Sequence, residues 1–184
     1  MDEPELVKRV QSGDTAAFDE LVRRHSRRAF AVAWRIMGRR EDAEDLVQEA
    51  FMAALNRIDS FEPGRPFAPW LLRIVMNRGL NARRARVLRA TDEIPHDVST
   101  GDDTPHEDLE RRELTERLRA AMADLPERQR MVLQLFELDG LSAAEVAEVL
   151  GISAGTVRWH AHEGRAALRR VLAGAYGNPE DEAR

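Results

Sequence analysis

Arginine and asparagine side chains recur between residues 66 and 86 at a spacing that groups them. Arg73, Asn77, Asn81 and Arg84 lie on one face of a helix, because the last three follow the first by four, eight and eleven residues. An asparagine amide pairs well with an adenine edge, and arginine binds the flanking phosphates. This face is therefore predicted to bind nucleic acid, and a solvated charged surface is the alternative.

Aromatic side chains lie close to this face in the sequence, at Phe61, Phe67 and Trp70. Aromatic rings beside arginines suit stacking on unpaired bases. Anchoring of the hydrophobic core is the alternative, and for Phe67 and Trp70 it is the favoured one.

Residues 141–160 carry the signals of a helix-turn-helix. Ser142 is a predicted N-cap, and Glu145, three residues later, completes a capping box. Gly151 permits a sharp turn because it lacks a Cβ atom, and Ser153 is predicted to cap the second helix. Such a pair of helices places the second one in a DNA major groove. An ordinary helical hairpin within a core is the alternative.

Acidic and polar side chains form another cluster, on the helix expected from Glu41 to Ile58. Its members are Asp42, Asp45, Gln48 and Glu49, and the apolar Met52 lies on the same face. Like charges on one helix face repel slightly, so the cluster is either solvated surface or a patch for a basic partner. Taken alone, it favours solvated surface. No histidine lies at ligand spacing, so no metal site and no cofactor are expected.

Helices must position all of these faces, and the pattern predicts an all-α chain. Apolar residues recur at helical spacing, while strand-like alternation is scarce. Before the helix-turn-helix, helices are predicted at Glu5–Gln11, Thr15–Met37, Glu41–Ile58, Pro66–Arg86, 107–123 and Pro126–Leu138. The expected organisation is a first helical domain over 1–86, an acidic linker over 87–106, a second helical domain over 107–173 and a polar tail over 174–184.

The composition restricts the class of protein. The formal net charge is −5, but the charges are unevenly distributed: arginines are concentrated in residues 65–89 and acids in residues 92–110. The chain can therefore have a local basic surface for phosphates despite its negative net charge. The chain has no cysteine, which excludes disulfides and cysteine-ligated zinc. No apolar run is long enough to cross a bilayer and the N-terminal residues are acidic, so we expect a cytoplasmic protein without membrane insertion.

Several segments resemble the bacterial sigma factors of the sigma-70 family. The segment Asp42–Leu55 resembles conserved region 2.2, and Phe67–Arg78 resembles regions 2.3 and 2.4. The segment Leu125–Leu135, followed by Asp139–Ser142 and Gly155–Arg158, resembles region 4. With region 4 following region 2 through only a linker, the chain is similar to the extracytoplasmic-function (ECF) group.

The resemblance implies that the chain binds core RNA polymerase, through its β′ and β subunits, and directs it to promoters. In the family, region 2.2 docks on a basic coiled coil of β′. The implied polymerase contacts are Asp42, Asp45, Gln48, Glu49 and Met52.

Promoter contacts follow from the same resemblance. Region 2 melts the −10 element and captures a flipped base in the loop before its last helix, here residues 60–66. The implied −10 contacts are Phe61, Arg65, Phe67, Trp70, Arg73, Asn77, Arg78, Asn81 and Arg84. Region 4 recognises the −35 element with the second helix of the helix-turn-helix. The implied −35 contacts are Ser153, Thr156, Arg158, Trp159, His162, Glu163 and Arg165. An anti-sigma factor is a further expected partner.

The second helix departs from the common family pattern. Glu163 stands where an arginine is frequent, and a carboxylate repels phosphate while accepting well from cytosine. Gly164 costs roughly 1 kcal/mol of helix stability relative to alanine. We therefore expect an unusual −35 preference. Packing of Trp159 beneath the helix is as well supported as a DNA contact.

Other functions stay open from the sequence alone. A free-standing helix-turn-helix regulator would bind duplex DNA without polymerase, and a sigma-like adaptor would bind polymerase without recognising promoters. An enzyme has little support, because the histidines pair with no apparent nucleophile and no phosphate-binding loop is present.

Overall fold

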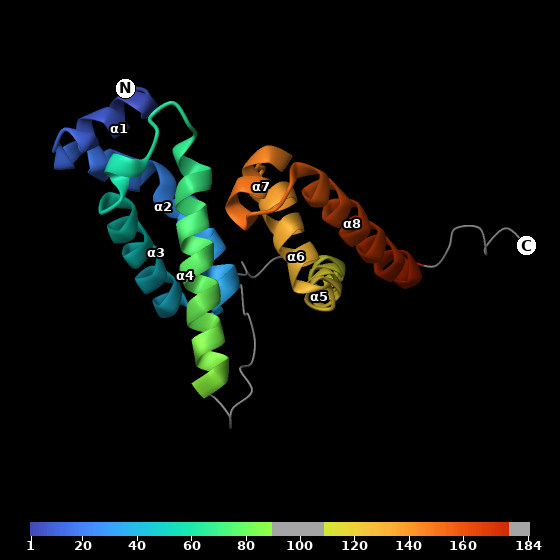
Figure 1. Ribbon diagram of the computed structural model, residues 1–184. Helices are drawn as coiled ribbons and strands as arrows, with labels where there is room; N and C mark the ends of the chain where they lie inside the picture. Colours follow the sequence, from blue (N-terminus) through green and yellow to red (C-terminus); the bar gives the residue numbers. More distant parts are fainter. Residues whose placement is uncertain (90–108, 177–184) are drawn as a thin grey trace, which may run out of the picture. The chain divides into compact units, whose positions relative to one another are not determined.

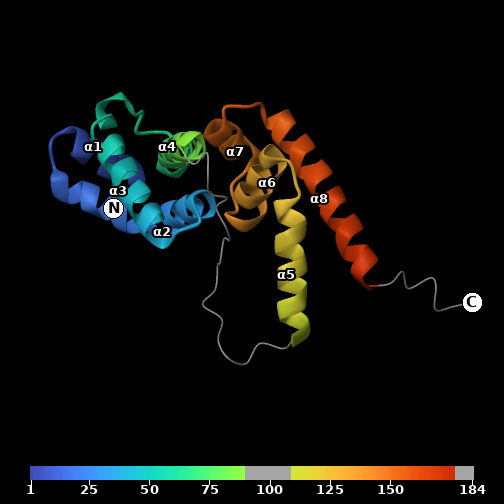
Figure 2. The same ribbon diagram turned by 90° about the horizontal axis from the view of Figure 1, so that it is seen from below.

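The computed structural model describes residues 1–89 and 109–176, and all regular structure within these ranges is helical (Figures 1 and 2). The elements are α1 (Glu3–Gln11), α2 (Thr15–Met37), α3 (Arg40–Leu55), η1 (Ile58–Ser60), α4 (Phe67–Arg89), α5 (Leu109–Ala123), α6 (Glu127–Leu133), η2 (Gln134–Leu138), α7 (Ala143–Leu150) and α8 (Ala154–Tyr176). The all-α prediction is confirmed. No helix in the described ranges is long and apolar enough to span a membrane.

Two compact units divide the fold. The first contains α1 to α4, and the second contains α5, α6, η2, most of α7, and α8. The predicted linker over 87–106 falls outside the described residues except for its first three, which continue α4. The predicted polar tail begins too early, because α8 continues to Tyr176; the rest of that tail is outside the described ranges.

Three long helices build the core of the first unit. Helices α2, α3 and α4 pack on one another, and α1 packs on α2 and η1 (Figure 1). Gly79 lies where α4 comes close to its neighbours, Ile36 on α2 and Leu46 on α3. A Cβ atom at this position would lie 2.9 Å from Cδ2 of Leu46 and 3.0 Å from Cγ2 of Ile36. The helix face that carries Gly79 is thereby fixed against α2 and α3, which leaves the opposite face of α4 for solvent.

Local signals set most helix ends in this unit. Asp14 caps α2, since its side chain accepts from the amide of Ala17. The Arg9 guanidinium donates to the same carboxylate and lowers the pKa of Asp14. Gly38 ends α2 with φ of 73°, as its lack of a Cβ atom allows.

The end of α3 is earlier than predicted. Helix α3 stops at Leu55, and Ile58 begins the short 3₁₀ helix η1 instead of closing α3. Ile58 is nevertheless buried. Its place in the apolar pattern of α3 therefore reflects packing in the core and not continuation of the helix. Similarly, Pro66 lies just outside α4, which begins at Phe67.

The second unit differs from prediction in one helix. Residues 126–138 form α6 followed by the π-helical turn η2, and Pro126 precedes the helix in an extended conformation. Helix α6 packs mainly against α8. A single-turn π-helix widens the backbone spiral, and no side-chain pattern distinguishes it from an α-helix.

The helix-turn-helix signals are confirmed in detail. The amide of Glu145 donates to Oγ of Ser142 over 3.3 Å, and the amide of Ser142 donates to Oε2 of Glu145 over 2.8 Å, which completes the capping box. Gly151 turns the chain with φ of 65°. Ser153 then caps α8 by accepting from the amide of Thr156 over 3.0 Å.

Candidate nucleic-acid and protein interfaces

Helix α8 presents a distinct outward face in its first turns. Arg158, Trp159 and His162 are exposed, and the indole of Trp159 is 56% exposed. Val157 and Ala161 on the opposite side are buried in the second unit. Packing of Trp159 beneath the helix is therefore excluded, and this side chain is available to a ligand.

The remaining candidates on α8 lie at the edges of that face. The hydroxyl groups of Ser153 and Thr156 are 2.8 Å apart and cap the helix. Glu163 is half-buried and has no ion pair within the described ranges. Arg165 is bound elsewhere, because its guanidinium lies 2.6 Å from Oε1 of Glu137 and 5.6 Å from the ring centroid of Phe136. Arg158, Trp159 and His162 thus face outward, whereas Arg165 is held against η2.

Gly164 has a packing role that the sequence pattern did not reveal. A Cβ atom at this position would lie 2.7 Å from Cδ1 and 3.1 Å from Cγ of Leu133. Helix α8 approaches α6 this closely only because the glycine has no side chain. The loss of helix propensity at Gly164 is therefore offset by close packing in the unit.

Helix α4 exposes the predicted polar face. Arg73, Asn77, Asn81 and Arg84 are all exposed, as their shared helical face predicts. The residues that face the core are buried: Leu71, Leu72, Val75 and Met76. The exposed face offers two amides between two guanidinium groups, a set suited to unpaired bases and phosphates.

The aromatic residues require a correction. Phe61 is 5% exposed and Phe67 is fully buried, so neither ring can stack on bases or contact the −10 strand directly. The stacking predicted for Phe61 is wrong, whereas the core anchoring favoured for Phe67 is confirmed. The ring centroids lie 5.6 Å apart, and Trp70 lies 4.8 Å from Phe61 and 5.5 Å from Phe67. These rings form a small core that supports the start of α4. Trp70 is half-buried and keeps part of its surface in solvent.

The acidic face of α3 is partly engaged within the first unit. Asp45, Gln48, Glu49 and Met52 are exposed, whereas Asp42 is half-buried and pairs with Arg86. Glu49 pairs with Arg78 of α4, with 2.9 Å between the nitrogen and oxygen atoms. Asp45 has no ion pair within the described ranges. Arg78, a predicted −10 contact, is therefore paired with Glu49, a predicted polymerase contact.

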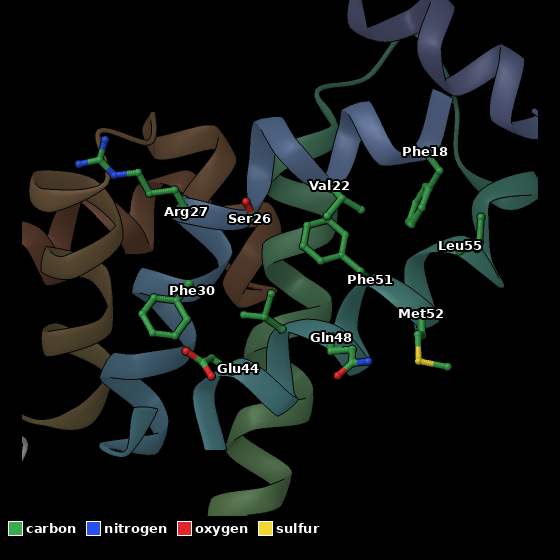
Figure 3. A pocket seen from close by; sticks show the side chains of 11 residues that line it. Phe18, Val22, Ser26, Arg27, Phe30, Glu44, Gln48, Phe51, Met52 and Leu55 are labelled. Carbon is green, nitrogen blue, oxygen red and sulfur yellow. The ribbon is translucent and has the colours of Figure 1, made fainter. Parts of the chain in front are cut away.

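An apolar groove adjoins this acidic face (Figure 3). It has a volume of about 600 Å³ and lies between α2 and α3. Its wall includes Val22 and Phe30 of α2 together with Phe51 and Met52 of α3. Met52 is 60% exposed and is contiguous with the other apolar side chains of the groove, and an apolar patch of this kind is typical of a protein interface. Gln48 and Glu44 lie at its edge (Figure 3).

The α2 side of this groove was missed from the sequence. Val22 and Phe30 belong to the apolar stripe of a long helix, and that stripe alone predicts core burial. Both residues remain only half-buried, because α3 does not cover them completely. Met52, an apolar residue among acids on the polar face of α3, was the available signal.

The described residues contain no cluster of histidine and carboxylate side chains that could hold a metal ion.

Comparison with known proteins identifies both units. Residues 21–89 match the family model of sigma-70 region 2, and residues 115–168 match that of sigma-70 region 4. The chain is 32% identical to the ECF RNA polymerase sigma factor SigW of Bacillus subtilis, over 90% of this chain and 94% of that protein. The chain belongs to the ECF sigma factors.

Two further comparisons agree with this assignment. The sigma factor is 38% identical to the ECF RNA polymerase sigma factor SigE of Mycolicibacterium smegmatis over 88% of its own length, but it spans only 65% of SigE. Its fold matches CnrH, solved in complex with the cytosolic domain of CnrY, with a TM-score of 0.67 and 30% identity over 94% of this chain and 97% of CnrH. In this sigma factor, α1 precedes the matched region 2 range.

Proposed function

We propose that this sigma factor binds core RNA polymerase through the acidic face of α3 and the apolar groove between α2 and α3. Exposed Asp45 and Gln48 offer acceptors for a basic partner, while Met52 and the groove offer apolar surface beside them. A helix with basic and apolar positions fits such a combination, because its apolar anchors enter the groove and its cations meet the carboxylates. The coiled coil of the β′ subunit is the expected partner, with β as a second polymerase contact.

Promoter recognition is assigned to α4 and α8. The exposed Asn77 amide and the neighbouring arginines suit the unpaired −10 strand, and binding of that strand offsets the cost of unstacking. Arg158, Trp159 and His162 form the outward face of α8 that would enter the −35 major groove. We propose that the first domain ends with α4 at Arg89 and that the second ends with α8 at Tyr176, each three residues later than the sequence predicted.

One observation carries the proposal: the first unit exposes two different binding faces, on α3 and on α4. A free-standing regulator needs only the helix-turn-helix, and it leaves both faces without a role. Catalysis is assigned to the polymerase, so the sigma factor itself is proposed to be non-catalytic and to act in the cytoplasm.

An anti-sigma factor is proposed as a regulatory partner. CnrH has been solved with the cytosolic domain of CnrY, which supports a protein partner for a chain of this fold. The groove and the acidic face would be shared between such a partner and polymerase, so their binding would be mutually exclusive.

Binding measurements with and without polymerase test the function. Labelled fragments of the source genome are incubated with the sigma factor alone, with core polymerase alone and with both. The proposal predicts selective retention of a fragment subset only when both proteins are present. Tight, selective binding by the sigma factor alone would favour the free-standing regulator, and polymerase binding without selectivity would favour the adaptor.

A further inference from the structure

Both ends of the loop before α4 are hydrogen-bonded to α1. Nε2 of Gln11 donates to the backbone carbonyls of Ile58 and Phe61, each over 2.8 Å. At the other end, the backbone amide of Phe67 donates to Oε1 of Glu3, also over 2.8 Å. The five residues between these anchors, 62–66, are the last five of the loop 60–66 that is expected to receive a flipped base.

The hydrogen bond donated by the amide of Phe67 gives one of the first amides of α4 a partner. The first amides of a helix lack partners within it, and Pro66, the preceding residue, has no side chain that accepts a hydrogen bond. Glu3 supplies the acceptor from another helix, and its negative charge is favourable at a helix N-terminus. Its second oxygen, Oε2, lies 2.8 Å from Nε2 of His25, a side chain that is 13% exposed. The carboxylate is therefore oriented from two sides.

Helix α1 acts as a rigid spacer between the anchors. Glu3 and Gln11 lie at its two ends, eight residues apart, which corresponds to roughly 12 Å along the axis. Leu6, Val7 and Val10 are buried against the unit and fix the position of the helix. Since α1 is held by its apolar face, the two polar anchors are held as well.

The loop between the anchors is presented to solvent. Glu62, Gly64, Arg65 and Pro66 are exposed, and the amide of Arg65 closes a turn onto the carbonyl of Glu62 over 3.0 Å. Pre-arrangement of such a loop lowers the conformational entropy lost when a ligand binds.

We propose that Glu3 and Gln11 are positioning residues for promoter opening, which hold loop 62–66 in the shape that accepts the unpaired −10 base. They act through the loop without touching DNA. This inference rests on the proposed function and extends the −10 machinery to α1, outside the region 2 match of residues 21–89.

The test uses holoenzyme assembled from core polymerase and the full-length sigma factor. The probe is a fluorescein-labelled single strand carrying the −10 element defined by start-site mapping. Glu3→Leu and Gln11→Met remove the acceptor and the donor, while Glu3→Gln keeps an acceptor oxygen. Glu5→Leu is the matched control, because Glu5 is exposed on the same helix. Affinity for core polymerase and the melting temperature are measured in parallel.

We expect Glu3→Leu, which loses one hydrogen bond to the loop, and Gln11→Met, which loses two, each to weaken binding of the single strand roughly 5- to 20-fold. Polymerase affinity should stay within about twofold, Glu3→Gln should fall between Glu3→Leu and wild type, and Glu5→Leu should match wild type.

Three outcomes would overturn the inference. Strand affinities equal to that of Glu5→Leu would show that the anchors do not position the loop. Parallel losses of strand and polymerase affinity would show general damage to the unit rather than positioning. If wild-type holoenzyme fails to bind the strand, the proposed −10 function itself fails, and the anchor inference fails with it.

Discussion

Glu49 on α3 and Arg78 on α4 form an ion pair, with 2.9 Å between the nitrogen and oxygen atoms. This pair joins the face proposed for polymerase to the face proposed for the −10 strand. Both side chains are largely exposed, so the pair contributes little to stability in water. Contacts with polymerase or with DNA could therefore replace this ion pair. Polymerase binding at Glu49 would then leave Arg78 able to contact DNA.

Charge reversal at Asp45 and Glu49 tests whether the acidic face of α3 binds polymerase. Asp45→Arg places a cation on the face proposed for a basic partner, so we expect the affinity for core polymerase to fall about 10-fold or more through repulsion. Glu49→Arg should lower the affinity for core polymerase by a similar factor. The measurement is a titration of labelled sigma factor with core polymerase, with Glu62→Arg, an exposed loop substitution, as control. Unchanged affinity of both α3 variants would remove this face from the interface.

Asn77→Ala should impair promoter opening more than polymerase binding. The amide is exposed between arginines, and loss of a base contact costs roughly 1–3 kcal/mol of discrimination. We expect open-complex formation to fall about 10-fold, measured by permanganate reactivity of the melted thymines. Asn56→Ala, an exposed asparagine at the end of α3, is the matched control. Equal losses of opening and polymerase affinity would contradict the assignment.

Gly164→Ala should destabilise the second unit, although alanine is the better helix former. The added methyl group would overlap Leu133, and overpacking of this kind costs typically 1–3 kcal/mol. Gly155→Ala is the matched control, since its nearest neighbour outside the local backbone is Oγ of Ser153 at 3.6 Å. That variant should be neutral or slightly stabilising. Thermal unfolding measures both, and equal stabilities would show that α6 adapts freely.

Glu163→Gln and Arg165→Gln should differ in their effect on promoter choice. Glu163 has no described ion pair and can accept from cytosine, whereas Arg165 is held by Glu137 and Phe136. We expect Glu163→Gln to change the base preference at one −35 position, by a factor of about 5 or more. Arg165→Gln should leave the preference unchanged. Transcription from a library randomised at −35 measures both, and a shifted preference for Arg165→Gln alone would reverse these roles.

Local chemistry made much of the fold predictable from the sequence. Capping by Ser142 and Glu145, and the turn at Gly151, depend on neighbours within a few residues, and the structure confirms them. The exposed stripe of α4 followed from helical periodicity in the same way. These features require no knowledge of distant contacts.

Features that depend on distant partners could not be predicted. The hydrogen bond from the amide of Phe67 to Glu3 and the approach of Gly164 to Leu133 join segments far apart in the chain, and the burial of Phe61 depends on how the helices around it pack. An aromatic residue beside arginines has the same local pattern whether it stacks on a base or fills a core. Only the packing of the helices decides between these outcomes.

In vitro transcription with purified core polymerase, this sigma factor and fragmented genomic DNA shows whether the chain directs polymerase to promoters. The 5′ ends of the transcripts are sequenced with and without the sigma factor. We expect discrete start sites that share −35 and −10 motifs and that appear only when the sigma factor is present. An unchanged set of start sites, despite stable binding of the sigma factor to polymerase, would contradict this expectation.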